Sequence, residues 1–469
     1  MTTKLDRPAA ALAGGMLVLR AISLARRPLW FDEIFTQWIA RKSPSRIVES
    51  LRLDSGPPLF YLLAHPLVRA GELLRFDPAA RILSFVAIGL LFAAMGPRYS
   101  GGPRFAVLLA ASPLMFFYSG EARQYALLAA VSFFLFLAAL RARDGWKPRL
   151  AAAAAAAALP WIHYLGLFVV AGSVILCLVR KKRASALLQI AGASLFLVWV
   201  PIARAQPSLS LAWNVSAVSF PRVFAAFGFW GDSLPYFSGW RTPAAWAGVV
   251  LGAALLLAAA EQARKSPAVR DALAFSILPL LFVFLASAFR PVYFPGRTEM
   301  ATLPVALWAA ARASRRSRAA NVLTLAAAIG GFAVIAGSFV EPAGPFPYSE
   351  TAKFLAPRCR SGDVVVAADA NYLPLRLEKD RGTLAAPLAG LPLEVESHPG
   401  WFEPIAPSEI DAEAARLRLR VAAVPAGGRV ELAIPPDPAL RDLAQRNLGS
   451  ETRRVLRPPG GYAILEIDR

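Results

Sequence analysis

Long apolar blocks separated by short polar segments run through the first three quarters of the chain, from residue 9 to residue 340. Blocks of this kind are long enough to cross a bilayer as α-helices. Threading them between the polar segments predicts a mainly α, polytopic helical membrane protein with about eleven transmembrane helices. The composition agrees, because 56% of the residues are hydrophobic and only 17% are charged.

The apolar blocks end near residue 340, and a stretch of mixed polarity with many prolines follows. This change predicts two domains, a transmembrane domain over 1–340 and a small soluble α/β domain over 341–469. Short β-like runs at 363–368, 419–424 and 462–467 predict strands, and 408–417 predicts a helix. No catalytic constellation is visible in this domain.

Charge divides the chain at the same place. Residues 341–469 hold 16 basic and 18 acidic residues, whereas residues 1–340 hold 35 basic and 13 acidic ones. A basic membrane domain without a nucleic-acid-binding motif indicates loops that face anionic phospholipid, and no nucleic-acid partner. Basic clusters such as "RKKR" (180–183) and "RASRRSR" (312–318) are typical of cytoplasmic loops, and this places the C-terminal domain outside the cell membrane.

The first outside loop, 26–80, contains one ambiguous segment. Residues 57–74, "PPLFYLLAHPLVRAGELL", are long enough to cross a bilayer. The segment carries His65, Pro66, Arg69 and Glu72, which suit a helix in the membrane interface better than a helix in hydrocarbon. We therefore expect interfacial helices over 26–80 and no span.

Four polar motifs fall on the outer side of this arrangement. They are "WFDE" (30–33), "SGEARQY" (119–125), "WIHY" (161–164) and "FPGRTEM" (294–300). The predicted spans otherwise contain almost no ionisable residues, and ionisable groups in a membrane protein usually mark a function. Their gathering on one side favours a functional site there.

Each motif also has a structural interpretation. Asp32 and Glu33 can stabilise the start of an interfacial helix, where carboxylates are favourable. Glu121 suits the first turn of the following helix, and Arg123 can extend to lipid headgroups. The histidine of the third motif can be a hairpin-tip residue, and the arginine of the fourth an interface anchor.

Taken together and in order, the motifs resemble those of the GT-C glycosyltransferases, and among them the bacterial relatives of protein O-mannosyltransferases and of lipid A aminoarabinose transferases. The resemblance covers residues 9–340, and it is carried by Asp32-Glu33, "PPLFY" (57–61), "YSGEARQYALL" (118–128), "WIHYLGLF" (161–168) and "GRTEMATLP" (296–304).

The resemblance implies a multi-pass inverting glycosyltransferase of the bacterial inner membrane, with its C-terminal domain in the periplasm. Such an enzyme moves a sugar from a polyprenyl-phosphate donor to a lipid, glycan or protein acceptor of the cell envelope. A lipid-phosphate donor keeps its reacting bond at headgroup depth, so the site needs a carboxylate base and cationic phosphate ligands there.

The resemblance also implies roles for individual residues. Catalytic roles fall to three carboxylates, Asp32, Glu33 and Glu121. Substrate binding falls to six side chains, Tyr61, Arg123, Tyr125, His163, Arg297 and Glu299. Asp32 would take the proton from the acceptor hydroxyl, while Arg123, Arg297 and His163 hold the leaving phosphate. Glu33 and Glu121 would orient these groups or hold a divalent cation, and the sequence leaves open whether a metal cofactor is used.

An alternative function is a carrier or flippase for lipid-linked sugars. A carrier favours polar residues or broken helices near the bilayer midplane. In this chain the ionisable groups gather at the outer ends of the predicted spans, which favours the enzyme.

Overall fold

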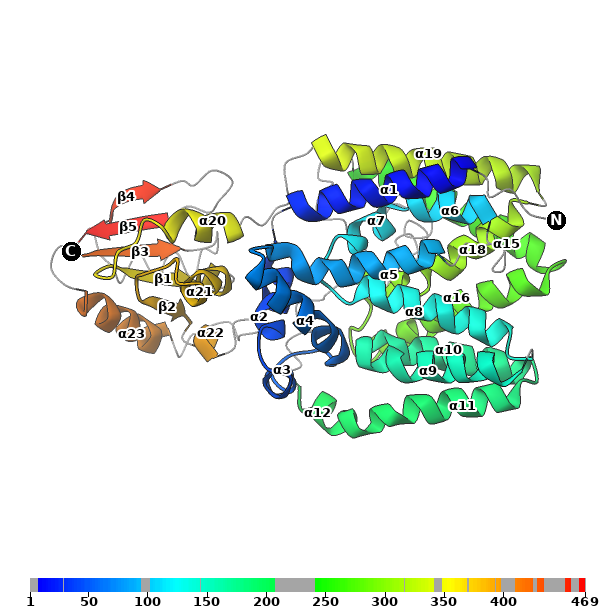
Figure 1. Cartoon of the computed structure of the whole chain (residues 1–469), viewed down its shortest axis with the longest axis horizontal. Coiled ribbons are helices and arrows are strands. Elements are labelled where there is room, and N and C mark those ends of the chain that lie inside the picture. The colour runs from blue at the N-terminus through cyan, green and yellow to red at the C-terminus, as the bar shows by residue number, and fades with distance from the viewer. Residues whose placement is uncertain are drawn as a thin grey trace. The chain divides into compact units, whose positions relative to one another are not determined.

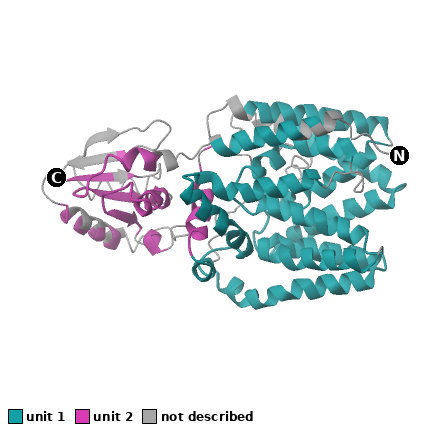
Figure 2. Ribbon diagram, viewed as in Figure 1, with its two compact units in different colours: residues 1–26, 43–342 teal, residues 27–42, 343–469 magenta. Residues whose placement is uncertain are grey.

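The computed structural model describes most of the chain and groups it into two compact units. The described residues are 7–27, 29–93, 102–143, 145–206, 241–315, 317–340, 348–368, 371–392, 394–397, 410–424, 428–433, 452–456 and 464–468. Residues 1–26 and 43–342 form the first unit, called here the helical unit. Residues 27–42 and 343–469 form the second, called the sheet unit (Figure 2).

The described part of the helical unit consists of helices and two 3₁₀ turns (Figure 1). They are α1 (Arg7–Arg26), α3 (Pro44–Leu51), α4 (Leu59–Leu73), α5 (Arg81–Ala93), α6 (Gly102–Ala111), α7 (Pro113–Ser119), α8 (Tyr125–Leu140), α9 (Trp146–Ile162), α10 (Leu165–Val179), α11 (Arg183–Ser194), α12 (Val200–Ala205), α15 (Arg241–Ala263), α16 (Pro267–Ser287), α17 (Arg297–Met300), α18 (Leu303–Ala313) and α19 (Arg318–Val340), with 3₁₀ turns at Asp77–Ala80 and Leu195–Trp199.

The prediction of a mainly helical chain with several apolar helices is confirmed. Within the described residues, four helical stretches are long and apolar enough to cross a membrane: Arg183–Ala205, Trp246–Ala263, Pro267–Ser287 and Arg318–Gly337. Shorter apolar helices accompany them, among them Tyr125–Leu140 and Leu165–Val179. The helices indicate an integral membrane protein. The number of spans stays a prediction.

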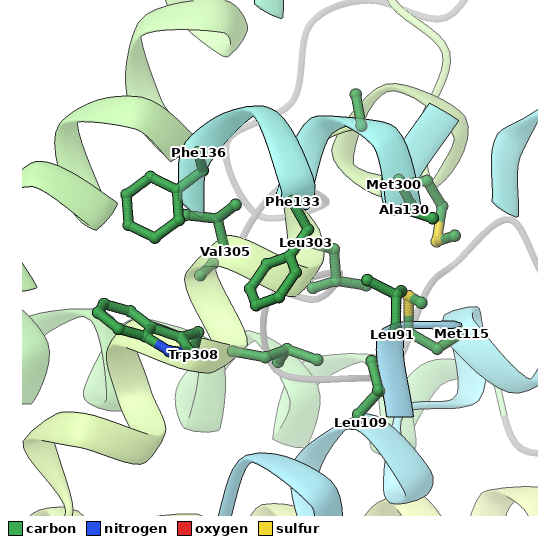
Figure 3. Packing of buried hydrophobic residues seen from close by; sticks show 14 of the residues in the cluster. Leu91, Leu109, Met115, Ala130, Phe133, Phe136, Met300, Leu303, Val305 and Trp308 are labelled. Carbon is green, nitrogen blue, oxygen red and sulfur yellow. The ribbon is translucent and has the colours of Figure 1, made fainter. Parts of the chain in front are cut away.

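Aromatic packing around α8 forms the centre of the helical unit (Figure 3). The ring of Phe136 meets that of Trp308 from α18 edge to face, with centroids 5.3 Å apart. Phe133 stacks on Phe105 of α6 at 5.2 Å. Lipid is as apolar as these side chains, so helices in a bilayer are held by close packing more than by exclusion from the solvent. This packing fixes α8 against α18 and, at the start of α8, against α17.

The sheet unit contains a five-stranded mixed sheet with helices around it. Its elements are α2 (Phe31–Ala40), α20 (Tyr348–Leu355), β1 (Val364–Ala368), α21 (Tyr372–Asp380), β2 (Leu388–Leu391), α22 (Glu394–Ser397), α23 (Ile410–Ala422), β3 (Arg429–Ala433), β4 (Thr452–Leu456) and β5 (Ile464–Asp468). The strand order is β2-β1-β3-β5-β4. Strand β1 is parallel to β2 and β3, whereas β5 is antiparallel to β3 and β4.

One predicted strand of this unit is wrong. Residues 419–424, "LRVAAV", form a short β-like run that predicts a strand. The structure instead continues α23 to Ala422, five residues beyond the end of the helix expected at 408–417. Leucine, arginine and alanine are all strong helix formers, and that preference prevails over the short β-like run. The strand of this region is β3, at Arg429–Ala433. The runs expected at 363–368 and 462–467 do form β1 and β5.

Helix α19 approaches α6 closely at a glycine. A Cβ atom added to Gly331 would overlap the carbonyl group of Ala111. Gly337 lies on the same helix, and a Cβ atom there would meet nothing within 4 Å. Both glycines thus lie in the same helix, but only Gly331 is in close contact with another helix.

We expect Gly331→Ala to destabilise the protein by about 1 to 3 kcal/mol, because the added methyl group forces two helix backbones apart. Gly337→Ala should instead be neutral or stabilising by up to about 1 kcal/mol, because alanine is the better helix former. Thermal unfolding of the detergent-solubilised protein, followed by loss of the monodisperse peak, measures both. Equal midpoints for the two variants would contradict this contact.

Candidate functional site

Three of the four polar motifs lie in links between helices of the helical unit. The motif 119–125 joins α7 to α8, and the motif 161–164 forms the turn between α9 and α10. The motif 294–300 includes α17, which precedes α18. Because α8 packs against α7, α9 and α17, these three links meet around its first turn.

Tyr125, the first residue of α8, is the side chain at which the motifs meet. Its ring centroid lies 5.1 Å from that of Tyr118 and 5.4 Å from that of His163. The guanidinium carbon of Arg297 lies 5.5 Å from the centroid of the Tyr125 ring, which is a cation–π distance. The structure therefore brings together three residues predicted from separate motifs, Tyr125, His163 and Arg297.

His163 lies in the turn between α9 and α10, outside both helices. Its Nδ1 atom accepts a hydrogen bond from the backbone N–H of Leu165 at 3.0 Å. Burial lowers the pKa of His163, and the nearby charges of Arg123 and Arg297 lower it further. The imidazole is therefore neutral and carries its proton on Nε2, so that Nε2–H can donate a hydrogen bond.

Arg123 belongs to the same site. It is half-buried and acts electrostatically on His163, as Arg297 does. Its backbone carbonyl accepts a hydrogen bond of 3.0 Å from the hydroxyl of Ser84 on α5. This bond ties the non-helical link between α7 and α8 to a neighbouring helix. Arg123 and Arg297 thus place two like charges near one imidazole.

Two buried carboxylates accompany the arginines. Glu299 is fully buried, and its Oε1 atom accepts a hydrogen bond of 2.7 Å from the hydroxyl of Tyr293. Its Oε2 atom has no hydrogen-bond partner within the described residues. Glu121 is also buried, and Tyr118 lies within electrostatic range of Glu121, Glu299 and Arg297. The site thus combines cations and carboxylates in a low-dielectric setting, where their interactions are strong.

The fourth motif, with Asp32 and Glu33, belongs to the sheet unit. Helix α2 begins at Phe31, and the carboxylate of buried Glu33 accepts a bond of 3.4 Å from the backbone N–H of Trp30. Reaching back to a free N–H is how a glutamate in the first turn stabilises a helix start. Glu33 therefore fits the interpretation that it stabilises the start of a helix. Asp32 is only half-buried, and its backbone carbonyl accepts a hydrogen bond from Thr36.

Tyr61 lies in a different polar cluster of the helical unit. It is buried, and its hydroxyl donates to the carboxylate of buried Asp54 at 3.4 Å. Tyr61 is linked through Asp54 to Tyr164, the residue after His163, because Asp54 acts electrostatically on Tyr164. Its assignment as a substrate-binding residue stays a prediction.

Sequence reasoning missed the polar residues that hold the loop beside Tyr61. The hydroxyl of Tyr164 donates to Gln206 at 2.6 Å and accepts from the indole of Trp199 at 3.0 Å. The amide of Gln206 donates in turn to the backbone carbonyls of Leu51 and Gly56. Gln206 lies 42 residues from Tyr164 and 150 or more from Gly56 and Leu51, so no local pattern signals their meeting.

Within the described residues, no group of three or more His, Cys, Asp and Glu side chains lies close enough to share a metal ion. Divalent cations need several oxygen ligands at once. Glu33 and Glu121 belong to no such group within the described residues, and their role in holding a cation stays a prediction.

Comparison with known proteins gives matches among solved structures only. No protein-family model and no curated protein matches the sequence. The crystal structure of ArnT from Cupriavidus metallidurans bound to undecaprenyl phosphate matches with a TM-score of 0.58 and 13% identity, covering 97% of both chains. The same enzyme in the apo state matches with a TM-score of 0.59 and 12% identity, again over 97% of both chains.

At this identity the match establishes the fold and not the activity. ArnT is a lipid A aminoarabinose transferase of the GT-C class. The resemblance predicted from the ordered motifs is therefore confirmed at the level of fold, over 97% of the chain: this protein has the fold of ArnT.

Proposed function

We propose that this protein is an integral-membrane inverting glycosyltransferase of the GT-C type, which moves a sugar from a polyprenyl-phosphate donor to a lipid, glycan or protein acceptor. The observation that carries the proposal is the meeting of Arg297, Tyr125 and His163, from three separate links, in a chain with the ArnT fold. The ArnT crystal structure contains undecaprenyl phosphate, which supports a polyprenyl-phosphate donor here.

The arrangement in the membrane belongs to the same proposal. About eleven helices cross the inner membrane of a bacterium, following the apolar blocks and the basic loops between them. The sheet unit then lies on the periplasmic side, and the links that carry Arg123, His163 and Arg297 lie at the outer ends of their helices. This is the depth at which the phosphate of a lipid-linked sugar is found.

The arginines and the histidine act on the leaving group. Arg123 and Arg297 each present a planar fork of N–H donors, which suits a phosphate better than a single ammonium group does. The Nε2–H of neutral His163 adds a third donor without adding charge. As the bond between the sugar and the phosphate breaks, negative charge grows on the phosphate oxygen, and these donors stabilise it.

The carboxylate of Asp32 acts on the acceptor. It takes the proton from the acceptor hydroxyl, whose oxygen attacks the anomeric carbon from the face opposite the phosphate. The bond from that carbon to the phosphate oxygen breaks, and polyprenyl phosphate leaves with the electron pair. The new glycosidic bond has inverted configuration. Glu33 supports the start of α2, and the buried carboxylates Glu121 and Glu299 orient the arginines.

Asp32→Asn tests the base. The amide preserves the size of the side chain and can still serve a helix start, so folded yield and donor binding should not change. Sugar transfer should slow by at least about 100-fold, the low end of what general base catalysis contributes. The rate is measured with purified protein and a radiolabelled polyprenyl-phosphate sugar. Glu33→Gln should cost stability more than rate. Transfer near the wild-type rate by Asp32→Asn would remove Asp32 from the mechanism.

Arg123→Lys and Arg297→Lys test the phosphate site. Lysine keeps the charge but loses the bidentate fork, so we expect transfer to fall by about tenfold or more in each variant. The matched control is Arg180→Lys, because Arg180 pairs with Asp271 between α10 and α16, away from Tyr125. The same transfer assay compares all three. Normal rates in both site variants would make these arginines interface anchors, and transport of an intact lipid-linked sugar without product would favour the carrier.

A further inference from the structure

Helix α2, which carries Asp32, belongs to the sheet unit although its neighbours in sequence do not. Residues 27–42 group with residues 343–469, whereas the chain on both sides of them groups with the helical unit (Figure 2). Within the sheet unit α2 packs against α21. The helix with the proposed base is therefore supported by a helix more than 300 residues later in the chain.

Helix α21 has two buried sides. Tyr372 and Leu375 belong to the core cluster that also contains Val365 and Ala367 of β1, so this side faces the sheet. Leu373 and Leu377 are equally buried but do not belong to that cluster. A helix with sheet on one side needs a second partner to bury the other side.

An ion pair identifies the partner of that second side. At 100° per residue, Leu373, Leu377 and Asp380 fall within an arc of about 60° on α21. The carboxylate of Asp380 lies 3.9 Å from the guanidinium of Arg41, the residue that ends α2. Asp380 also pairs with Arg376 on its own helix at 3.0 Å. The side that carries Leu373 and Leu377 is thus the side that faces α2.

We propose that α21 is a positioning element for the reaction: its packing on α2 and the pair of Arg41 with Asp380 fix the helix that presents Asp32. The inference rests on the proposed function, since it takes Asp32 as the base. It gives residues 343–469 a part in catalysis, although none of the proposed catalytic carboxylates lies in that segment. Arg41 and Asp380 are positioning residues and touch no substrate.

Charge reversal tests the proposal in the full-length, detergent-purified protein. Arg41→Glu and Asp380→Arg each turn the attraction into repulsion, and the double variant restores it in the opposite sense. All the proteins compared also carry Arg376→Gln, because Arg376 pairs with Asp380 on α21 and would repel an arginine at position 380 in the double variant as well. A base displaced by a fraction of an ångström loses much of its effect, so we expect kcat to fall by about tenfold in each single variant. KM for the donor should stay within about twofold, because donor binding does not use Asp32. The double variant should recover kcat to within about threefold of the wild type.

The matched control is Arg416→Glu, which makes the same charge change in the sheet unit but breaks a pair within α23 alone. It should leave kcat unchanged. Hydrogen exchange of the α2 amides gives a readout independent of sugar transfer, and exchange should accelerate in both single variants and return in the double one. Should Asp380→Arg fail to give folded protein, Asp380→Asn with Arg41→Gln removes the charges without repulsion, and a loss of about threefold in kcat is then expected for each single change.

The outcomes separate the two proposals. No transfer by the wild-type protein would overturn the proposed function itself. An active wild type with normal kcat in both single variants, or a loss that the double variant does not restore, would overturn the positioning role and leave the proposed function standing. A loss of kcat in both single variants, with recovery in the double variant, would establish the positioning role of α21.

Discussion

The cost of placing charge in hydrocarbon decides where ionisable groups are found in this protein. An ionisable group inside a bilayer must be paired, buried in protein or moved to a helix end. The links around the first turn of α8 meet this demand, because they lie outside the apolar helices and are enclosed by their packing. Arg297 lies against the ring of Tyr125, His163 stays neutral, and Glu299 accepts a hydrogen bond from Tyr293. Everything that the site does depends on helices that hold these links together.

The sequence was informative wherever a physical rule acts on neighbouring residues. Apolar block lengths located the helices, because a bilayer demands a minimum length of apolar chain. The motifs with Glu121, His163 and Arg297 were recognisable because ionisable residues are rare in such a chain. Their order along the sequence was enough to predict the fold that ArnT shares at 13% identity.

Sequence reasoning failed where distant segments meet. Nothing near Tyr164 signals that its hydroxyl meets Gln206, and nothing near Phe31 signals that α2 packs on α21. The strand expected at 419–424 failed for a different reason, since a short β-like run and a helical preference compete over a few residues. The distinction between Asp32 and Glu33 also needed the structure, because adjacent carboxylates look alike until one of them is seen on the N–H of Trp30.

The discontinuity of the sheet unit has a consequence for the order in which the protein is made. A ribosome synthesises α2 early, then the whole of residues 43–342, and α21 only afterwards. Domains usually fold from the N-terminal end as they emerge. Helix α21, against which α2 packs, is made only in the last quarter of the chain. Closing this long loop costs entropy, though the cost grows only slowly with loop length. The proposed catalytic helix is therefore among the last parts to be completed, so a nascent or shortened chain can insert its helices in a membrane without yet having a formed reaction centre.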